Sequence, residues 1–495
     1  MGKRLWCALV LAFVAVLAST RLGIAGSTTG FTTQVSPSSQ TNATEPSVAV
    51  DRSDGTVYVA WQATGTHVAR SDDGGRTFTQ LAEQDPIFGR DSGDVHVRIG
   101  GLTDCTALRQ DPTTQCRPGT HRVYVSSLTR LPDPLQAKVA YTDDRGATWT
   151  HNNIAATNPS FIDRPWMAVS PGPTAETDRV YISYHDFSIS HVYVATSTNG
   201  ARTFGPSVDV MAQNPQAAIQ SFCNTVPSDI EVDPETGEVY VQWITADLVA
   251  NTQGCNITQN ENFHEVWVAH SLPGGLVWDA HLVYDGGPNE NTDEIFATLA
   301  VDDSGTAGVH GNVYSVFPDN HLGPNVFDIW FTRSADQGAT WSRIVKVDSD
   351  KGTHYFPWIA AGSTGRVDFI WLNTTDYTPT DAERSPWFAT FGQTTSGTAT
   401  TPKFFQTAAS SSVMHVGGIC TNGLFCDLVT GGNRDLADSI SIVIDRGGSA
   451  ALAWTDQGRV LHGPTHITFA CVTSQQSAIV GANSGLSCKG PAGPK

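Results

Sequence analysis

Residues that could take part in chemistry recur in short runs that combine a carboxylate with a cation, an imidazole or an aromatic ring. The clearest runs are Asp163-Arg164-Pro165-Trp166, His185-Asp186, His354-Tyr355 with Trp358, and Arg434-Asp435 with Asp438. Carboxylates bind sugar hydroxyls or exchange protons, and aromatic rings stack on the apolar faces of sugars. The pattern favours a carbohydrate site, although an isolated acidic residue beside a turn can equally cap a strand.

Other kinds of chemistry have less support in the sequence. It contains no Gly-x-Ser-x-Gly, no His-Glu-x-x-His and no phosphate-cradling glycine loop. Calcium is the ion that its Asp-rich turns would admit through oxygen ligands, and these turns are Asp186, Asp293-Glu294 and Asp319-Asn320. Because no EF-hand sequence is present, no cofactor is expected to be required.

Charge and the first residues predict the compartment and the class of partner. The 495 residues carry a formal net charge of −19, which disfavours nucleic acid and anionic membranes as partners. Lys3 and Arg4 precede an apolar run from Leu5 to Leu17, and small residues follow. This is the pattern of a signal peptide over residues 1–26, too short for a membrane span. We expect a secreted or cell-surface monomer that binds a glycan or glycoprotein.

Eight cysteines remain once Cys7 is removed with the signal peptide, and they fall into sequential pairs. Their spacing lacks the tight Cys-x-x-Cys of a zinc knuckle, so structural disulfides are expected in an oxidising compartment. Other connectivities stay open. The pairs that proximity favours are Cys105 with Cys116, Cys223 with Cys255, Cys420 with Cys426, and Cys471 with Cys488.

The elements that must position these residues are strands, because a hairpin unit recurs along the chain. Residues 45–61 and 227–243 both read as a strand, a turn and a second strand, with alternating Val, Ile, Tyr and Trp around Asp-Gly or Thr-Gly. Looser copies begin at Asp94, Arg164, Phe296, Phe356 and Ser439. Seven such hairpins, each with room for two further strands, predict an all-β propeller of seven blades over residues 27–475. Residues 476–495 would be a C-terminal tail.

A second unit alternates with the hairpin and carries an eight-residue turn, the Asp box. Residues 71–78, 142–149 and 334–341 match Ser/Thr-x-Asp-x-Gly-x-Thr-aromatic, whereas residues 197–204 and 271–278 are altered copies. A short carboxylate can accept backbone N–H groups within its own turn, and glycine permits a positive φ. We therefore interpret Asp73, Asp144 and Asp336 as scaffold and not as catalytic groups.

The ends of the chain predict how the ring closes. The strand around Thr465–Ser474 has no obvious partner after it, and residues 30–36 resemble the fourth strand at residues 76–82. An N-terminal strand that completes the last blade would remove an exposed sheet edge. In such a meander, the loop entering each innermost strand and the loop after the second strand share one face. Sites of propellers lie at the axial mouth of that face.

The Asp boxes and blade repeats resemble the sialidase superfamily of Asp-box propellers over nearly the whole mature chain. That resemblance implies six blades, which would result if residues 94–128 were an insertion. It also implies three arginines that clamp a substrate carboxylate, a Tyr–Glu nucleophile pair and an acidic proton donor. The family's Arg-Ile-Pro motif is absent, and the nearest string is Asp163-Arg164-Pro165-Trp166.

Carried onto this chain, these roles fall on a small set of residues. Arg98, Arg164 and Arg434 are the arginines placed to converge, although Arg98 can instead point between two blades. Tyr355 with Glu294 would supply the nucleophile pair and Asp163 the acid. A purely structural role in the core accounts for Tyr355 equally well. Further substrate contacts are expected from Trp166, Trp358, His185 and Asp186.

The sequence is compatible with two functions. The first is an exo-acting, sialidase-like glycosidase. The second is a non-catalytic propeller that binds glycans or proteins at the cell surface, because one fold hosts many functions.

Overall fold

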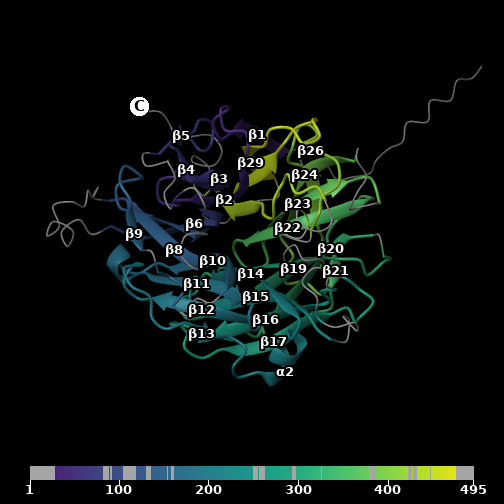
Figure 1. The fold of residues 1–495 in the computed structure, drawn as a ribbon, viewed down its shortest axis with the longest axis horizontal. Coiled ribbons are helices and arrows are strands. Elements are labelled where there is room, and N and C mark those ends of the chain that lie inside the picture. The colour runs from purple at the N-terminus through teal and green to yellow at the C-terminus, as the bar shows by residue number, and fades with distance from the viewer. Residues whose placement is uncertain are drawn as a thin grey trace, which may run out of the picture.

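A computed structural model describes residues 28–474 apart from residues 82–88, 90–91, 104–118, 130–134, 153, 158–160, 249–254, 256–261, 293–296, 325, 378–384, 422–425, 427–431 and 446. Seven antiparallel sheets stand around a common axis, and the innermost strands surround the centre of the ring (Figure 1). Each innermost strand packs against that of the next blade, and the last one packs against the first. The seven-bladed propeller predicted from the hairpin count is therefore confirmed.

Six of the blades are formed by consecutive strands that run from the axis outward. The bounds are as follows: blade 1, β2 (Thr44–Val50), β3 (Val57–Ala63), β4 (Gly65–Ser71), β5 (Thr79–Gln80); blade 2, β6 (Ser92–Leu102), β7 (His121–Thr129), β8 (Gln136–Thr142), β9 (Thr150–Asn152); blade 3, β10 (Ile162–Ser170), β11 (Arg179–Asp186), β12 (His191–Ser197), β13 (Val208–Asp209); blade 4, β14 (Asn224–Val232), β15 (Val239–Ala246), β16 (Glu265–Ser271), β17 (Asp279–Asp285); blade 5, β18 (Thr298–Val301), β19 (Val313–Asp319), β20 (Asp328–Ser334), β21 (Val345–Lys346); blade 6, β22 (Thr353–Ala361), β23 (Val367–Thr374), β24 (Pro386–Thr394), β25 (Phe405–Ala408).

Blade 7 joins the two ends of the chain. It contains β27 (Ser441–Ile444), β28 (Ala450–Asp456), β29 (His466–Ser474) and, outermost, β1 (Thr28–Gln34). β1 pairs with β29 antiparallel along its whole length, and the two strands lie side by side in Figure 1. The predicted closure by an N-terminal strand is thus confirmed. The hairpin that begins at Asp94 is blade 2, so the six-bladed alternative is wrong.

Few elements lie outside the blades. β26 (His415–Val416) pairs with β24, η1 (Ala175–Thr177) lies between β10 and β11, and α2 (Pro215–Gln220) precedes β14. Within the described residues, no helix has the length and apolar character needed to cross a membrane. Disulfides join Cys223 to Cys255 and Cys420 to Cys426, as the spacing predicts. Cys105, Cys116 and Cys488 lie outside the described residues.

The core lies between neighbouring blades and repeats with them. In five blades the second strand contains Val-Tyr near its start, and each of these tyrosines is at most 2% exposed: Tyr58, Tyr124, Tyr181, Tyr240 and Tyr314. A blade cannot cover both of its faces alone, so these large rings are buried by the sheet that follows.

The Asp boxes have the structural role expected from their sequence. Asp336 Oδ1 accepts the backbone N–H of Thr340 at 2.9 Å, and Thr340 Oγ1 donates to Asp336 Oδ2 at 2.6 Å. Asp73 and Asp144 make the same two contacts in their own boxes. Burial acts to raise the pKa of Asp336, but the hydrogen bonds from Thr340 and Ser334 together outweigh it and hold that pKa below its usual value. Each carboxylate therefore folds its own turn.

We expect Asp336→Ala to lower the free energy of unfolding by about 1–2 kcal/mol, because three hydrogen bonds within the turn are lost. Asp336→Asn is the matched control, since its amide oxygen can still accept Thr340 N–H. Asn199 accepts Thr203 N–H in this way at 3.0 Å in the altered box of blade 3. Urea unfolding checks both variants, and an Asn variant as unstable as the Ala variant would contradict this account.

Candidate functional site

The order of strands assigns the connecting loops to two faces of the ring. Each first strand runs from one face to the other and the second strand returns, so the loops that enter the first strands share a face with the second-strand exits. The Asp-box turns connect third to fourth strands and lie on the opposite face. The face with the entering loops is called the mouth face below.

Four innermost strands begin with the same backbone irregularity. Glu45, Asp94, Arg164 and Phe356 have φ values of 52°, 49°, 56° and 56°, each within a β-bulge of its strand. A left-handed conformation costs a residue with a Cβ about 1 kcal/mol or more, and bulges re-aim side chains beside functional sites. The repeated strain therefore marks the start of these strands as a candidate functional site.

Charged side chains from three blades meet near the start of the innermost strands. Arg164 Nη2 of blade 3 lies 2.6 Å from Asp438 Oδ2, which precedes the first strand of blade 7. Arg434 also binds Asp438 Oδ2, and its Nε lies 3.3 Å from Oδ1. The backbone N–H of Asp438 donates to Glu45 Oε1 of blade 1 at 3.1 Å. Glu45, Arg164, Arg434 and Asp438 are called the mouth cluster.

The two carboxyl groups of the mouth cluster differ in protonation. Glu45 is 2% exposed, and its Oε2 has no hydrogen-bond partner among the described residues. Burial, with Asp94 and Asp438 nearby, raises the pKa of Glu45 to about 8 against the pull of both arginines. Burial would also raise the pKa of Asp438, but Arg164 and Arg434 outweigh it and lower that pKa to about 2. At neutral pH the cluster holds two cations, one anion and one neutral acid.

Aromatic rings from separate blades lie next to each other along the axis. Trp166 of blade 3 and Trp358 of blade 6 have ring centroids 5.2 Å apart, and His96 of blade 2 meets Trp166 edge-on at 5.4 Å. Trp166 Nε1 donates to the carbonyl of Pro227 at 2.7 Å. Both tryptophans are at most 6% exposed. Because blades 3 and 6 lie across the ring from each other, these two rings meet near its axis.

The structure brings together Arg164 and Arg434 but not Arg98. Arg98 lies farther along β6 and pairs with Glu231 of blade 4 at 3.2 Å, away from Asp438. Asp163 Oδ2 lies 3.9 Å from Arg164 Nε, at the edge of the mouth cluster.

The remaining predicted site residues are placed as follows. His185 is 1% exposed and packs on Phe187, and burial together with Arg164 lowers its pKa to about 3. Asp186 accepts the N–H and hydroxyl of Ser188 at 2.9 and 2.6 Å, which caps a turn. Tyr355 is 1% exposed between Phe327 and Trp387. Glu294 lies outside the described residues.

Sequence reasoning placed Glu45 and Asp438 on entering loops, and Asp438 in a run with Arg434, but it assigned neither a role in the site. A usable signal was present, since Glu45-Pro46 begins the first hairpin where Arg164-Pro165 begins the third and Phe356-Pro357 the sixth. Superposing the repeats would have marked these residues as equivalent. Nothing in the sequence marked Asp438 as the partner of two arginines.

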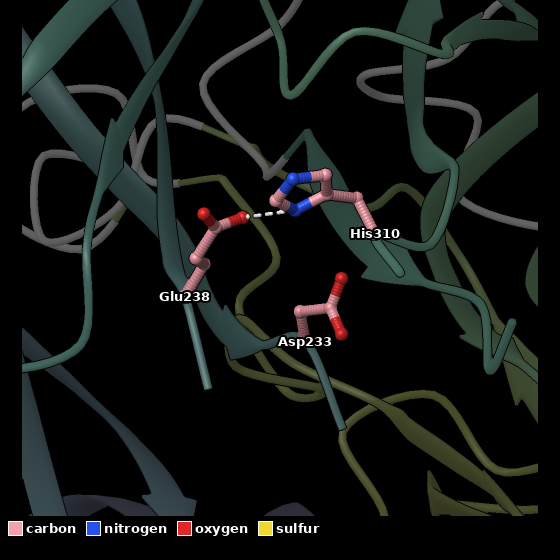
Figure 2. Close-up of side chains that lie close together, drawn as sticks. All are labelled: Asp233, Glu238 and His310. Carbon is pink, nitrogen blue, oxygen red and sulfur yellow. Dashed lines mark ion pairs between the residues drawn. The ribbon is translucent and has the colours of Figure 1, made fainter. Parts of the chain in front are cut away.

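Four groups of His, Asp and Glu in the described part of the chain are close enough to bind a metal. Figure 2 shows one of them, in which His310 Nδ1 lies 2.7 Å from Glu238 Oε2 beside Asp233. Here Gln337 Nε2 already contacts both oxygens of Glu238, at 3.0 and 3.1 Å, and Asp233 accepts backbone N–H groups.

A second group is Asp328, Asp348 and His354. Lys346 Nζ lies 2.5 Å from Asp328 Oδ1 and 3.0 Å from Asp348 Oδ2. The ammonium therefore stands where a metal would otherwise be held. The group of His264, Glu265 and Asp285 is similarly occupied, because Trp267 Nε1 and Gln220 Nε2 donate to Glu265 at 2.8 and 2.7 Å. The fourth group comprises Glu290, Asp319 and His321.

Comparisons with known proteins identify no family. No family model and no curated protein matches the chain. Among solved structures, a protein of unknown function from Dyadobacter fermentans has 12% identity and a TM-score of 0.45, covering 90% of this chain and 98% of its own. The α-L-arabinofuranosidase of Fusarium graminearum has 14% identity and a TM-score of 0.40, covering 69% and 92%. The phage phi92 endosialidase has 9% identity and a TM-score of 0.44, covering 91% and 70%.

Proposed function

We propose that this protein is an extracellular, carbohydrate-directed propeller that binds an acidic sugar at the mouth cluster. The observation that carries the proposal is the convergence of Arg164 and Arg434, from blades 3 and 7, on a single carboxylate oxygen. Two guanidinium groups so arranged match the geometry of a carboxylate. The sugar carboxylate would compete with Asp438 for both arginines.

Access and orientation are consistent with a ligand that arrives from the mouth face. The side chains of Arg164 and Arg434 are 10% and 13% exposed, whereas that of Asp438 is 1% exposed. The arginines are thus the members of their ion pairs that reach solvent. Trp166 and Trp358 are at most 6% exposed and pack against each other, so they support the first strands of their blades and do not themselves stack on the sugar.

Glycoside hydrolysis is the second candidate, and Glu45 favours it. A carboxyl group that keeps its proton at neutral pH is the general acid required for departure of a glycosidic oxygen. Burial raises the pKa of Glu45 to about 8, which makes it a better candidate for this role than the more exposed Asp163. Its unpartnered Oε2 would donate to the leaving group.

The test is a glycan array that carries sialic acid, uronic acid and neutral termini, followed by calorimetry on the glycans that bind. We expect acidic termini to bind and neutral ones not to. Arg164→Lys and Arg434→Lys keep the charge but lose the planar fork, so each should weaken binding by about tenfold or more. Arg98→Met is the matched control, because Arg98 pairs elsewhere with Glu231 and its loss should leave the affinity unchanged.

Release of fluorophore from sialosides and uronides separates the two candidates. Turnover that Glu45→Gln abolishes, with binding retained, supports a glycosidase, and binding without turnover in the wild-type protein supports a lectin-like role. Equal binding of neutral glycans, or acidic-glycan binding that survives both lysine variants, would contradict the proposed site.

A further inference from the structure

Three ionisable side chains meet on the mouth face of blade 5. Glu290 lies on the loop between β17 and β18, and Asp319 and His321 lie at the end of β19. Their ligand atoms, one oxygen of each carboxylate and one ring nitrogen, are all within 4.8 Å of one another. His321 Nδ1 is 3.2 Å from Glu290 Oε1. The three residues are called the blade-5 triad.

Asp319 is the member whose environment is incomplete. The residue is 0% exposed, and its Oδ1 accepts the N–H of His321 at 2.7 Å and lies 3.4 Å from the hydroxyl oxygen of Tyr284. Its Oδ2 is buried, and nothing in the described part of the chain hydrogen-bonds to it. A buried carboxylate oxygen left in this state carries the cost of its lost hydration.

The triad also differs from the group of Asp328, Asp348 and His354 in its charge balance. Across the described residues, neither Glu290 nor Asp319 forms an ion pair with a lysine or arginine, and His321 is the single basic partner. In the group of Asp328, Asp348 and His354, by contrast, Lys346 supplies the positive charge. The blade-5 triad therefore has two carboxylates for one titratable base.

The surrounding contacts hold the triad in place. Tyr284 donates to Glu290 Oε2 at 2.7 Å, and Trp330 Nε1 donates to the carbonyl of Asp319 at 3.3 Å. The ring of Trp330 also meets that of His321 edge-on at 5.4 Å. Contacts of this kind orient metal ligands before the metal arrives.

We propose that Glu290, Asp319 and His321 form a binding site for a first-row divalent cation, Zn²⁺ or Mn²⁺. An imidazole nitrogen with two carboxylate oxygens suits these ions, whereas Ca²⁺ prefers oxygen ligands throughout. Three protein ligands leave further positions for water. The bound cation links the loop entering blade 5 to the end of its second strand, and this proposal does not depend on the sugar site.

The test uses the full chain after treatment with EDTA, titrated with ZnCl₂, MnCl₂ or CaCl₂ by calorimetry and by thermal unfolding. We expect one equivalent of Zn²⁺ or Mn²⁺ to bind and to raise the unfolding temperature in a saturable way. Asp319→Asn keeps an acceptor for the N–H of His321 and should still fold, yet it should lose at least about tenfold in affinity. His321→Ala, an exposed position, should do the same.

Two controls locate the bound ion. Asp279→Asn removes an exposed carboxylate beside His281, and His310→Ala disrupts the group drawn in Figure 2; both should bind as the wild type does. The proposal is overturned if no stoichiometric binding occurs, if Asp319→Asn and His321→Ala bind normally, if His310→Ala alone loses binding, or if Ca²⁺ binds more tightly than both Zn²⁺ and Mn²⁺.

Discussion

A chain that begins at Ser36, and therefore lacks β1, is expected to lose the cooperative unfolding transition of the closed ring and to self-associate. β1 pairs with the outer side of β29 from Thr28 with Ser474 to Gln34 with Thr468, and the N–H of the next residue, Val35, donates to the Ile467 carbonyl at 2.8 Å. Its loss would expose the edge of β29, and exposed edges pair with other chains. Phe31 would also no longer pack near Phe469, a ring of the core between blades 7 and 1.

The measurement is thermal unfolding with light scattering, in comparison with a chain that begins at Ser27 and keeps β1. A point variant tests the same strand without deletion. A Cβ added to Gly30 would lie 2.6 Å from the backbone oxygen of Cys471, so Gly30→Val should push β1 away from β29. Thr32→Val, at an exposed position of the same strand, is the control and should be neutral. Normal stability of the chain beginning at Ser36 would contradict the assigned role of β1.

The second large effect is expected from Glu45→Gln, which should stabilise the protein at alkaline pH and change little at acidic pH. Burial, Asp94 and Asp438 raise the pKa of Glu45 from 4.5 to about 8, although Arg164 and Arg434 oppose them. The folded state therefore holds a proton that the unfolded state releases above about pH 4.5. The glutamine side chain is neutral at every pH and can still accept the N–H of Asp438.

The sign follows from proton linkage. Because the folded pKa is raised, the contribution of Glu45 to stability is fully present below its unfolded pKa and is lost as the pH rises to about 8. Within that window the wild type should lose up to about 1.4 kcal/mol per pH unit relative to Glu45→Gln. Urea unfolding at intervals from pH 4 to 9 gives the free energy of unfolding of both proteins. Other buried acids, such as Asp319, contribute equally to both, so their contributions cancel in the difference. The free energy of unfolding of Asp279→Asn, an exposed change, should vary with pH as that of the wild type does. If the free energy of Glu45→Gln also varied with pH in this way, the buried neutral acid would be refuted.

Features that repeat along the chain could be predicted from the sequence. The number of blades, the closure by an N-terminal strand and the scaffold role of Asp73 and Asp336 all follow from local patterns. Alternating apolar residues specify a strand, Asp-Gly specifies its turn, and a carboxylate bonds to the backbone of its own loop. Repetition made each of these patterns visible several times, so one altered copy, such as the box with Asn199, did not hide the fold.

The composition of the mouth was decided by tertiary structure. Arg164 and Arg434 are separated by more than half of the chain, and they meet because blades 3 and 7 both place a first strand at the axis. Arg98 has the same chemistry, yet its position farther along β6 directs it to Glu231. The protonation of Glu45 likewise depends on burial and on charges contributed by three other blades. Sequence specifies each blade through local bonds, whereas distances across the axis and the exclusion of water exist only once all seven blades have closed.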